Sequence, residues 1–432
     1  MQAQVYVNQA AAGNNDGTSW ANAYTSLHDA LANPTDDIWV AAGIYTTGDA
    51  TADSTAVFEI NDNLSLYGGF DGTESMFNQR DFEENETILT ADLLGDDVED
   101  DFNINRTDNS RHVLSVTTGI AGNVIIDGFT VLGGNTSPFF DSGSYFRSGG
   151  GIYALSPIQV TNCGFANNFG RSGGSIYLGG GASGSTITTS GFIANASNSQ
   201  SAGIFVDSLT NVTVSGCLFE DNIATRGAYY CLRGSGHVVE DCEFIDNENN
   251  GGFGGAFFNW NSQNLTVVDC IFEGNSAGSA GAIYSDGREI LDLNPDGFML
   301  TNCTFTNNLT TDGNGGAMFA FRSSATFSGC DFSGGSAQGS GGFLFLNGND
   351  KVINITNCNF EDANIGGWGG AQICYGENSI FNISNCSYTG NVASNLGGAI
   401  HCGFTAITNI DNCIFDANTA ISGGAIGLQN DS

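Results

Sequence analysis

Basic residues and proline are scarce in this sequence of 432 residues. It has 10 Lys and Arg residues, with Lys351 the only lysine, against 46 Asp and Glu residues, and its formal net charge is −36. Such a surface repels nucleic acids and anionic membranes, because binding to either depends on basic side chains. With only 4 prolines, most tight turns must be made by other residues, and the 62 glycines can supply them.

Long apolar runs are also missing. No stretch approaches the roughly 18 apolar residues of a membrane-spanning helix. The first residues, MQAQVYVN, look like what remains after a signal peptide is removed at an A-x-A-type site. We therefore expect an exported protein, extracellular or on the outer cell surface. The last residues, GGAIGLQNDS, stop within a repeat, so we expect the natural chain to continue and the uncapped coil to permit end-to-end self-association.

A motif recurs with a period of about 27 residues. It consists of an aromatic residue, an Asn three residues later in most copies, and then a GGAI-like segment such as 397–400. A fixed period without helical spacing indicates a solenoid of β-strands. The aromatic positions are Phe165, Phe192, Phe219, Phe244, Phe272, Phe305, Phe332, Phe360, Tyr388 and Phe415.

Each copy contains three short alternating segments. In KVINITNCNF (351–360) the alternation shifts by one residue between Ile355 and Cys358, which indicates a corner. Three strands and three corners per repeat predict an all-β fold, a single-stranded right-handed parallel β-helix of about 13–14 coils with an N-terminal capping helix. Stacked coils would align the Asn side chains as a ladder, and the Gly pairs would permit tight corners.

The 12 cysteines occupy two positions of the repeat. Nine precede the aromatic residue by two positions, and Cys231, Cys374 and Cys402 follow the GGAI-like hydrophobe by two. Both positions are expected to face inward. The cysteines of an exported protein could form six disulfides, but parallel side chains on stacked coils disfavour the required torsion. The other interpretation is a buried ladder of free thiols.

Three regions are expected along the chain. Residues 1–45 form an N-terminal cap in which Leu27, Ala30 and Leu31 lie on one face of a short helix that begins after Thr25 or Ser26. Residues 46–128 form irregular first coils, and 129–432 form the regular repeats, truncated at the C-terminus.

The first coils contain an acidic loop, residues 92–110. It is either a solvated loop or a calcium site that uses oxygen atoms of five acidic residues. No other cofactor is expected. The candidate ligands are Asp92, Asp96, Asp97, Glu99 and Asp101.

Two sequence features resemble known families. The FxxN and GGAI pair resembles the repeats of chlamydial polymorphic outer-membrane proteins. The opening DGTSWANAYTSLHDAL, with LYGGFDGTE and ETILTAD, is similar to secreted β-helix proteins of Bacteroidetes-type bacteria. These resemblances imply a right-handed parallel β-helix, export, surface display and often adhesion.

Catalytic patterns are weak. A polysaccharide lyase needs a basic group to take a proton and a cation or Arg to neutralise the uronate, yet Lys351 stands alone and no Arg occupies a repeated position beside carboxylates. Glycosidases of this fold resemble one another in NTD, GHG and RIK motifs, and these motifs are absent from this sequence. The sequence therefore favours a non-enzymatic protein, with a lyase or glycoside hydrolase acting on acidic glycans as the alternative.

One position of the GGAI-like strand is aromatic in eight successive coils. It follows the inward hydrophobe, so we expect it to face outward and form an exposed apolar stripe that binds a glycan or a surface protein. Two interpretations without a binding role remain: an internal stack, or a stripe covered by residues 136–148. The eight residues are Tyr153, Tyr177, Phe205, Tyr230, Phe258, Tyr284, Phe319 and Phe345.

These features together predict an adhesin or structural binding module. A third possibility is a filament-forming or secretion-cargo module whose only role is to be long.

Overall fold

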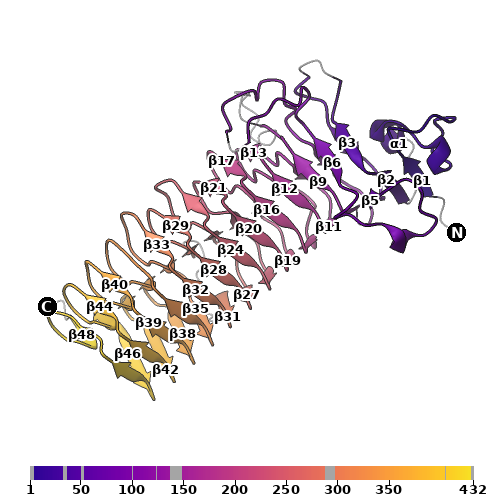
Figure 1. The fold of residues 1–432 in the computed structure, drawn as a ribbon. Coiled ribbons are helices and arrows are strands. Elements are labelled where there is room, and N and C mark those ends of the chain that lie inside the picture. The colour runs from indigo at the N-terminus through magenta and orange to yellow at the C-terminus, as the bar shows by residue number, and fades with distance from the viewer. Residues whose placement is uncertain are drawn as a thin grey trace. The chain divides into compact units, whose positions relative to one another are not determined.

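The computed structural model describes residues 4–32, 37–49, 53–99, 101–122, 124–136, 148–287, 297–403 and 405–429. The chain divides into two compact units, Met1–Leu218 (unit 1) and Phe219–Ser432 (unit 2). Both consist mainly of short parallel strands that follow one another in three repeating series, named sheets A, B and C. Figure 1 shows consecutive sheet A strands of unit 2 side by side, from orange to yellow.

Unit 1 contains the irregular first coils. Its sheet A strands are β1 (Gln4–Val7), β2 (Asp37–Ala41), β5 (Ser65–Phe70), β8 (Val124–Asp127), β11 (Ile158–Thr161), β15 (Thr186–Thr188) and β19 (Thr213–Ser215). Sheet B has β3 (Gly43–Thr46), β6 (Thr87–Thr90), β9 (Thr130–Leu132), β12 (Gly164–Ala166) and β16 (Gly191–Ile193). Sheet C has β4 (Phe58–Ile60), β7 (Leu114–Val116), β10 (Ile152–Ala154), β14 (Ile176–Leu178) and β18 (Ile204–Asp207).

Unit 2 repeats the same arrangement more regularly, and β20 (Leu218–Glu220) of sheet B lies at the boundary in the sequence. Sheet A has β23 (Val238–Glu240), β27 (Leu265–Val268), β31 (Phe298–Thr301), β35 (Ala325–Ser328), β38 (Val352–Thr356), β42 (Ile380–Ser384) and β46 (Ile407–Asp411). Sheet B has β24 (Glu243–Ile245), β28 (Ile271–Glu273), β32 (Thr304–Thr306), β36 (Asp331–Ser333), β39 (Asn359–Glu361), β43 (Ser387–Thr389) and β47 (Ile414–Asp416). Sheet C has β22 (Tyr229–Leu232), β26 (Phe257–Trp260), β30 (Ile283–Asp286), β34 (Met318–Phe321), β37 (Leu344–Asn347), β41 (Gln372–Tyr375), β45 (Ile400–Gly403) and β48 (Ile426–Leu428).

Very short strands follow sheet B in many turns. They are β13 (Phe169–Gly170) and β17 (Ala196–Ser197) in unit 1, and β21 (Ile223–Ala224), β25 (Glu248–Asn249), β29 (Ser276–Ala277), β33 (Leu309–Thr310), β40 (Asn364–Ile365) and β44 (Val392–Ala393) in unit 2. Counted along the chain, the three main series contain 14, 13 and 13 strands. The predicted parallel β-solenoid with three strands per coil is therefore confirmed, with about 13 turns.

Residues with left-handed backbone conformation make the corners between sheets A and B. The residue before each of the nine cysteines that precede a repeat aromatic has a positive φ, for example 50° at Asn162, 53° at Asp269 and 55° at Asn357. Asn, Asp and Gly tolerate this conformation better than other residues. The corner explains why the alternation shifts by one residue at this point of the repeat.

Aromatic rings of consecutive turns stack inside the solenoid. In unit 2, Phe272 lies between Phe244 and Phe305 with ring centroids 4.9 and 4.8 Å away and interplanar angles of 5° and 4°. The equivalent rings are paired residue by residue in sheet B. The repeat therefore places identical side chains directly above one another.

Buried asparagines join successive turns at the next corner. The Asn275 Nδ2 group donates to Asn308 Oδ1 at 3.0 Å, and Asn247 Nδ2 donates to Asn275 Oδ1 at 3.0 Å. The same side-chain oxygens also accept backbone N–H groups of the preceding turn. These bonds satisfy corner backbone groups that the strand ladders leave without partners.

All 12 cysteines are free thiols, and all but the half-buried Cys413 are buried. Burial raises the pKa of the Cys163 and Cys231 thiols to about 12. The Cys163 and Cys231 thiols are therefore poor nucleophiles and act as small core side chains.

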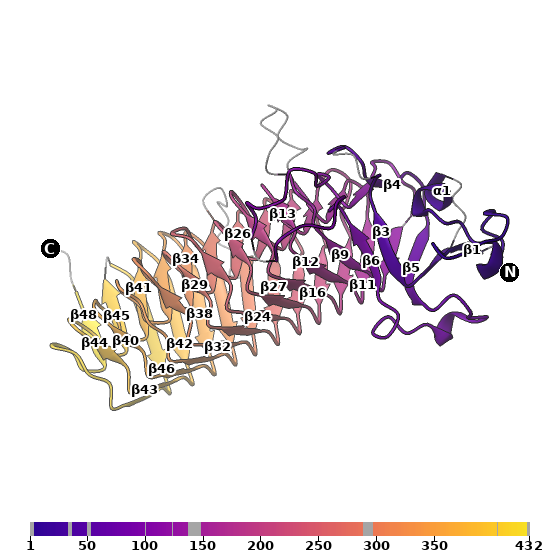
Figure 2. The same ribbon diagram turned by 45° about the horizontal axis from the view of Figure 1, so that its top comes forward.

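In the described part of the chain, the helical elements with defined bounds lie in unit 1. They are α1 (Leu27–Ala32) and two 3-10 helices, Trp20–Asn22 and Phe77–Gln79. Helix α1 contacts β1 and β4 (Figure 2), and its residues Leu27 and Ala30 are buried. Within the described ranges, no helix has the length and hydropathy needed to span a membrane.

Candidate functional site

The outward residues of sheet C form one aligned column in each unit. In unit 1, Glu59 pairs with Ser115, Ser115 with Tyr153, Tyr153 with Tyr177, and Tyr177 with Phe205. In unit 2 the column consists of Tyr230, Phe258, Tyr284, Phe319, Phe345, Ile373 and His401. Both columns follow from the alternation of a strand whose neighbouring residues are buried in the core.

The prediction of an exposed aromatic stripe is wrong. Of the eight predicted residues, Tyr153, Tyr177, Phe205, Tyr230, Phe258, Tyr284 and Phe345 are between 1% and 9% exposed, and Phe319 is half-buried. Flanking segments cover the column: Phe253 packs on Tyr284 at 4.7 Å, and a Cβ atom on Gly179 would lie 2.5 Å from the Tyr177 ring. The ligand-binding role of these residues stays a prediction.

Mutual stacking also covers the ring faces in unit 1. The Tyr153 and Tyr177 rings are 5.2 Å apart at 8°, and the Tyr177 and Phe205 rings are 5.8 Å apart at 15°. On its other side, Tyr153 stacks on the His112 imidazole at 5.2 Å. A ligand can therefore reach ring edges and hydroxyl groups here, but not a free aromatic face.

Two small pockets open beside the unit 1 column. The first has a volume of about 240 Å³ and is lined by Glu59, Arg111, His112, Ser115 and Tyr153, together with residues 54–57. Glu59 and Ser115 belong to the column itself, so this pocket lies over the early turns of sheet C. It combines one guanidinium group, one carboxylate and several hydroxyl groups.

The second pocket has a volume of about 220 Å³. Its lining residues are Ser148, Arg171, Ser172, Tyr177, Gln200, Phe205 and Asp207. The Tyr177 hydroxyl donates to Asp207 Oδ2 at 3.1 Å, which fixes one carboxylate oxygen of the pocket. Arg171 is exposed and Asp207 is half-buried, so both charged groups are accessible to a ligand.

Unit 2 carries a second outward column that sequence reasoning missed. It lies two residues further along each strand and includes Trp260, Asp286 and Phe321, which are paired in register. The Arg226 guanidinium lies 5.5–5.9 Å from the Tyr230, Phe258 and Trp260 rings. The alternation of the strand would have predicted this column, had the second outward position been followed through the repeat.

The acidic loop brings together a different set of carboxylates from the one predicted. Asp92, Asp96 and Asp108 each place an oxygen atom within 4.8 Å of the others. Asp97 instead forms an ion pair with the buried Arg106 at 3.2 Å, and burial raises its pKa to about 6. Glu99 and Asp101, although predicted, are not in the group. Asp108 was missed because it follows the acidic run by several residues.

A cation at this loop stays a prediction. Mutual repulsion among the three carboxylates would be relieved by calcium, whose preferred ligands are such oxygen atoms. The pKa of Asp96 is raised by desolvation and by the charges of Asp108 and Asp92. Backbone N–H groups of Gly95 and Asp97 already donate to Asp92, at 2.7 and 3.1 Å, and they relieve part of the repulsion without a metal.

We expect millimolar calcium to raise the melting temperature relative to chelator. The substitution Asp96→Asn should abolish the shift, because it removes a carboxylate from the group. Glu99→Gln, which changes a predicted ligand outside the group, should keep it. Melting curves of the three proteins with calcium and with chelator test this, and equal curves for the unsubstituted protein would contradict calcium binding.

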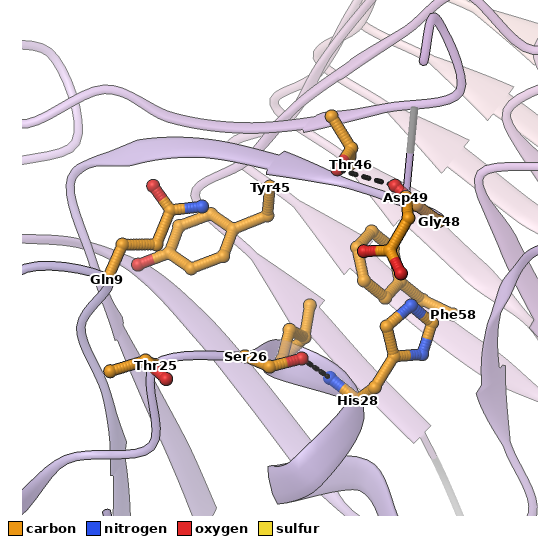
Figure 3. Close-up of a pocket in the computed structure, with 10 residues that line it drawn as sticks. Gln9, Thr25, Ser26, His28, Tyr45, Thr46, Gly48, Asp49 and Phe58 are labelled. Carbon is orange, nitrogen blue, oxygen red and sulfur yellow. Dashed lines mark hydrogen bonds between the residues drawn. The ribbon is translucent and has the colours of Figure 1, made fainter. Parts of the chain in front are cut away.

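A third pocket, of about 280 Å³, lies at the start of α1. Figure 3 shows Ser26 and His28 on one side, Thr46, Gly48 and Asp49 on another, and Tyr45 beside Gln9. The Tyr45 hydroxyl donates to Ala41 O at 2.9 Å, and His28 Nε2 bonds Thr47 O at 2.9 Å. These bonds anchor the Tyr45 hydroxyl and the His28 ring to backbone carbonyl groups beside the pocket.

Buried histidines give the fold a dependence on pH. His112 Nδ1–H donates to Gly149 O at 2.8 Å, and burial lowers its pKa to about 4 from 6.5. Burial also lowers the pKa of His237 to about 4. Both are therefore neutral at pH 7.

Stability should fall as the pH drops from about 6.5 towards 4. In that window the unfolded chain binds protons that the folded His112 does not, so the stabilisation that is complete above pH 6.5 is progressively lost. The loss amounts to roughly 2–3 kcal/mol per histidine. Urea midpoints at pH 7.5 and 4.5 should differ less in His112→Gln than in the unsubstituted protein. Equal differences would show that His112 does not titrate in this way.

Comparison with known proteins supports the fold. The model of a family described as "Right handed beta helix region" matches residues 115–295. The fold is a right-handed parallel β-helix. A segment of 67 residues, 15% of this chain, is 43% identical to the probable autotransporter YfaL of Escherichia coli K12, and it spans 5% of that protein's length.

Two solved structures are similar at low sequence identity. PfbA, a surface adhesin of Streptococcus pneumoniae, has a TM-score of 0.37 at 10% identity, and the match covers 91% of this chain and 86% of PfbA. The A-module of the Azotobacter vinelandii mannuronan C-5 epimerase AlgE6 has a TM-score of 0.31 at 9% identity, covering 95% and 96% of the two chains. Both scores are too low to support an argument about function.

Proposed function

We propose that the chain is an exported β-helix module, displayed on the outer cell surface, that binds a glycan or a surface protein without chemical turnover. The observation that carries this proposal is the pair of pockets beside the outward column of sheet C in unit 1. Each pocket offers fixed donors and acceptors on a repetitive scaffold. Adhesion or structural attachment is the role that such a surface serves best.

Placement outside the cell is supported by two observations. The segment of 67 residues is similar to a probable autotransporter. The net charge of −36 suits a soluble protein that avoids nucleic acids and anionic membranes. We propose that export uses a signal peptide that is removed.

Binding without turnover can be tested directly. The protein is passed over immobilised neutral and acidic polysaccharides and cells, and the soluble glycans are monitored for cleavage products, including unsaturated sugars by ultraviolet absorbance. The proposal predicts retention on a glycan or a cell surface without new products. Product formation would show a lyase or hydrolase, and no retention on any of these surfaces would contradict the proposal.

A further inference from the structure

The two pockets of unit 1 lie on neighbouring turns of the same face. Tyr153 of the first pocket pairs with Tyr177 of the second, and Ser148 forms a bridge with Ser172 at the edge of the column. Successive turns are separated by about 4.8 Å, the spacing of adjacent strands. We propose that the two pockets are adjacent subsites for uncharged sugar units of one glycan chain, an inference that rests on the proposed binding function.

Pocket size limits each subsite to a small group. The volumes of about 240 and 220 Å³ are below the roughly 300–1,000 Å³ of pockets that take drug-sized ligands. A single sugar ring fits this limit, whereas a folded peptide or a nucleotide does not. Because the pockets repeat on neighbouring turns, a ligand with a repeating unit uses both.

The charges of each pocket balance. Arg111 is accompanied by Glu59 in the first, and Arg171 by Asp207 in the second. An acidic sugar would meet a carboxylate together with each guanidinium group, on a chain whose net charge is −36. At physiological salt, charges more than about 8 Å away are largely screened. The charged residues of the pocket itself therefore decide whether a neutral or an acidic sugar is preferred. Balanced pockets favour hydroxyl groups over carboxylates.

Hydrogen bonds, not stacking, would hold the sugar. The faces of Tyr153 and Tyr177 are covered by neighbouring rings, so the usual aromatic platform is not available. The guanidinium group of Arg171 can donate to a sugar oxygen atom, and the carboxylate of Asp207 can accept from a sugar hydroxyl. Its Oδ2 atom is oriented by the Tyr177 hydroxyl, so the acceptor is preorganised.

The experiment measures affinity for neutral and acidic polysaccharides at low and high salt. The neutral probes are β-1,3-glucan, β-1,4-mannan and arabinoxylan, and the acidic probes are polygalacturonate and alginate. At least one neutral glycan should bind with a Kd that changes less than about twofold between 50 and 500 mM NaCl, because no counterions are released. Each acidic glycan should bind more weakly than that neutral glycan.

Paired substitutions locate the site. Arg171→Gln should weaken the neutral interaction about tenfold or more, because a hydrogen bond from a charged group is lost. Asp207→Asn should also weaken it. The matched control is Arg226→Gln, which changes an arginine in the segment before β22 of unit 2 and should leave the Kd within twofold. Melting temperatures show that the variants are folded.

The contrary results differ in whether they overturn the neutral subsites alone or the proposed binding function as well. Tighter, salt-dependent binding of an acidic glycan would overturn the neutral subsites and leave the proposed binding function intact. Neutral binding that Arg171→Gln and Asp207→Asn do not change would place the sugar elsewhere and also overturn the inference. No binding to any glycan would overturn the inference, and retention on a cell surface would then be the evidence that the broader function survives.

Discussion

Replacing Gly370 by alanine is expected to destabilise unit 2 by more than about 4 kcal/mol or to prevent its folding. A Cβ atom at this position would lie 1.8 Å from Gly398 O and 3.1 Å from Val392 N. Both are backbone atoms, so no side-chain rotation relieves the overlap. Gly370 N also donates to Gly397 O at 2.9 Å, which holds the two turns at this separation.

A glycine in an open position provides the control. The atom nearest to a Cβ on Gly164 is Thr130 Oγ1 at 3.9 Å, an ordinary contact. Gly164→Ala should therefore change stability by no more than about 1 kcal/mol. Thermal and urea unfolding of the two variants measure the difference. A melting temperature for Gly370→Ala close to that of Gly164→Ala would show that consecutive turns are not packed this closely.

Replacing Asn275 by alanine is expected to cost about 3–5 kcal/mol. The side chain is fully buried, donates to Phe244 O at 2.8 Å and Asn308 Oδ1 at 3.0 Å, and accepts from Asn247 N at 3.0 Å. Alanine would leave the buried Asn247 N–H and Phe244 C=O without this partner. Each unsatisfied buried group costs about 1–3 kcal/mol, so the two groups cost about 2–6 kcal/mol together, and the expected loss lies in the middle of that range.

The matched control uses an asparagine with the same inter-turn bond at the surface. Asn409 Nδ2 donates to Asn382 Oδ1 at 2.9 Å, but Asn409 is exposed. Water replaces this bond after substitution, so Asn409→Ala should cost no more than about 0.5 kcal/mol. Comparable losses for the two variants in urea unfolding would contradict the importance of the buried amide.

The repeat explains why the fold could be predicted from the sequence. The period alone aligns Phe244, Phe272 and Phe305, and parallel pairing needs only that equivalent residues share a register. The corner was visible as a shift in the alternation before Cys358. These features are local and repeated many times, so each copy supports the others.

The candidate site was harder to predict for physical reasons. The outward direction of Tyr177 follows from alternation, but its burial depends on the path of flanking segments such as Gly179, which no periodicity records. Arg171 and Asp207 are not repeated in the neighbouring turns, so no periodicity marks them. The carboxylate of Asp108 joins Asp92 and Asp96 only through the folding of a loop.

A crystal structure of the protein with an oligosaccharide prepared from the retained neutral glycan tests the central claim most directly. The account predicts sugar hydroxyl groups within hydrogen-bond distance of Arg171 and Asp207, and of Arg111 and Glu59, on the outward face of sheet C in unit 1. Sugar bound in the pocket beside His28 or against Trp260 in unit 2 would contradict it.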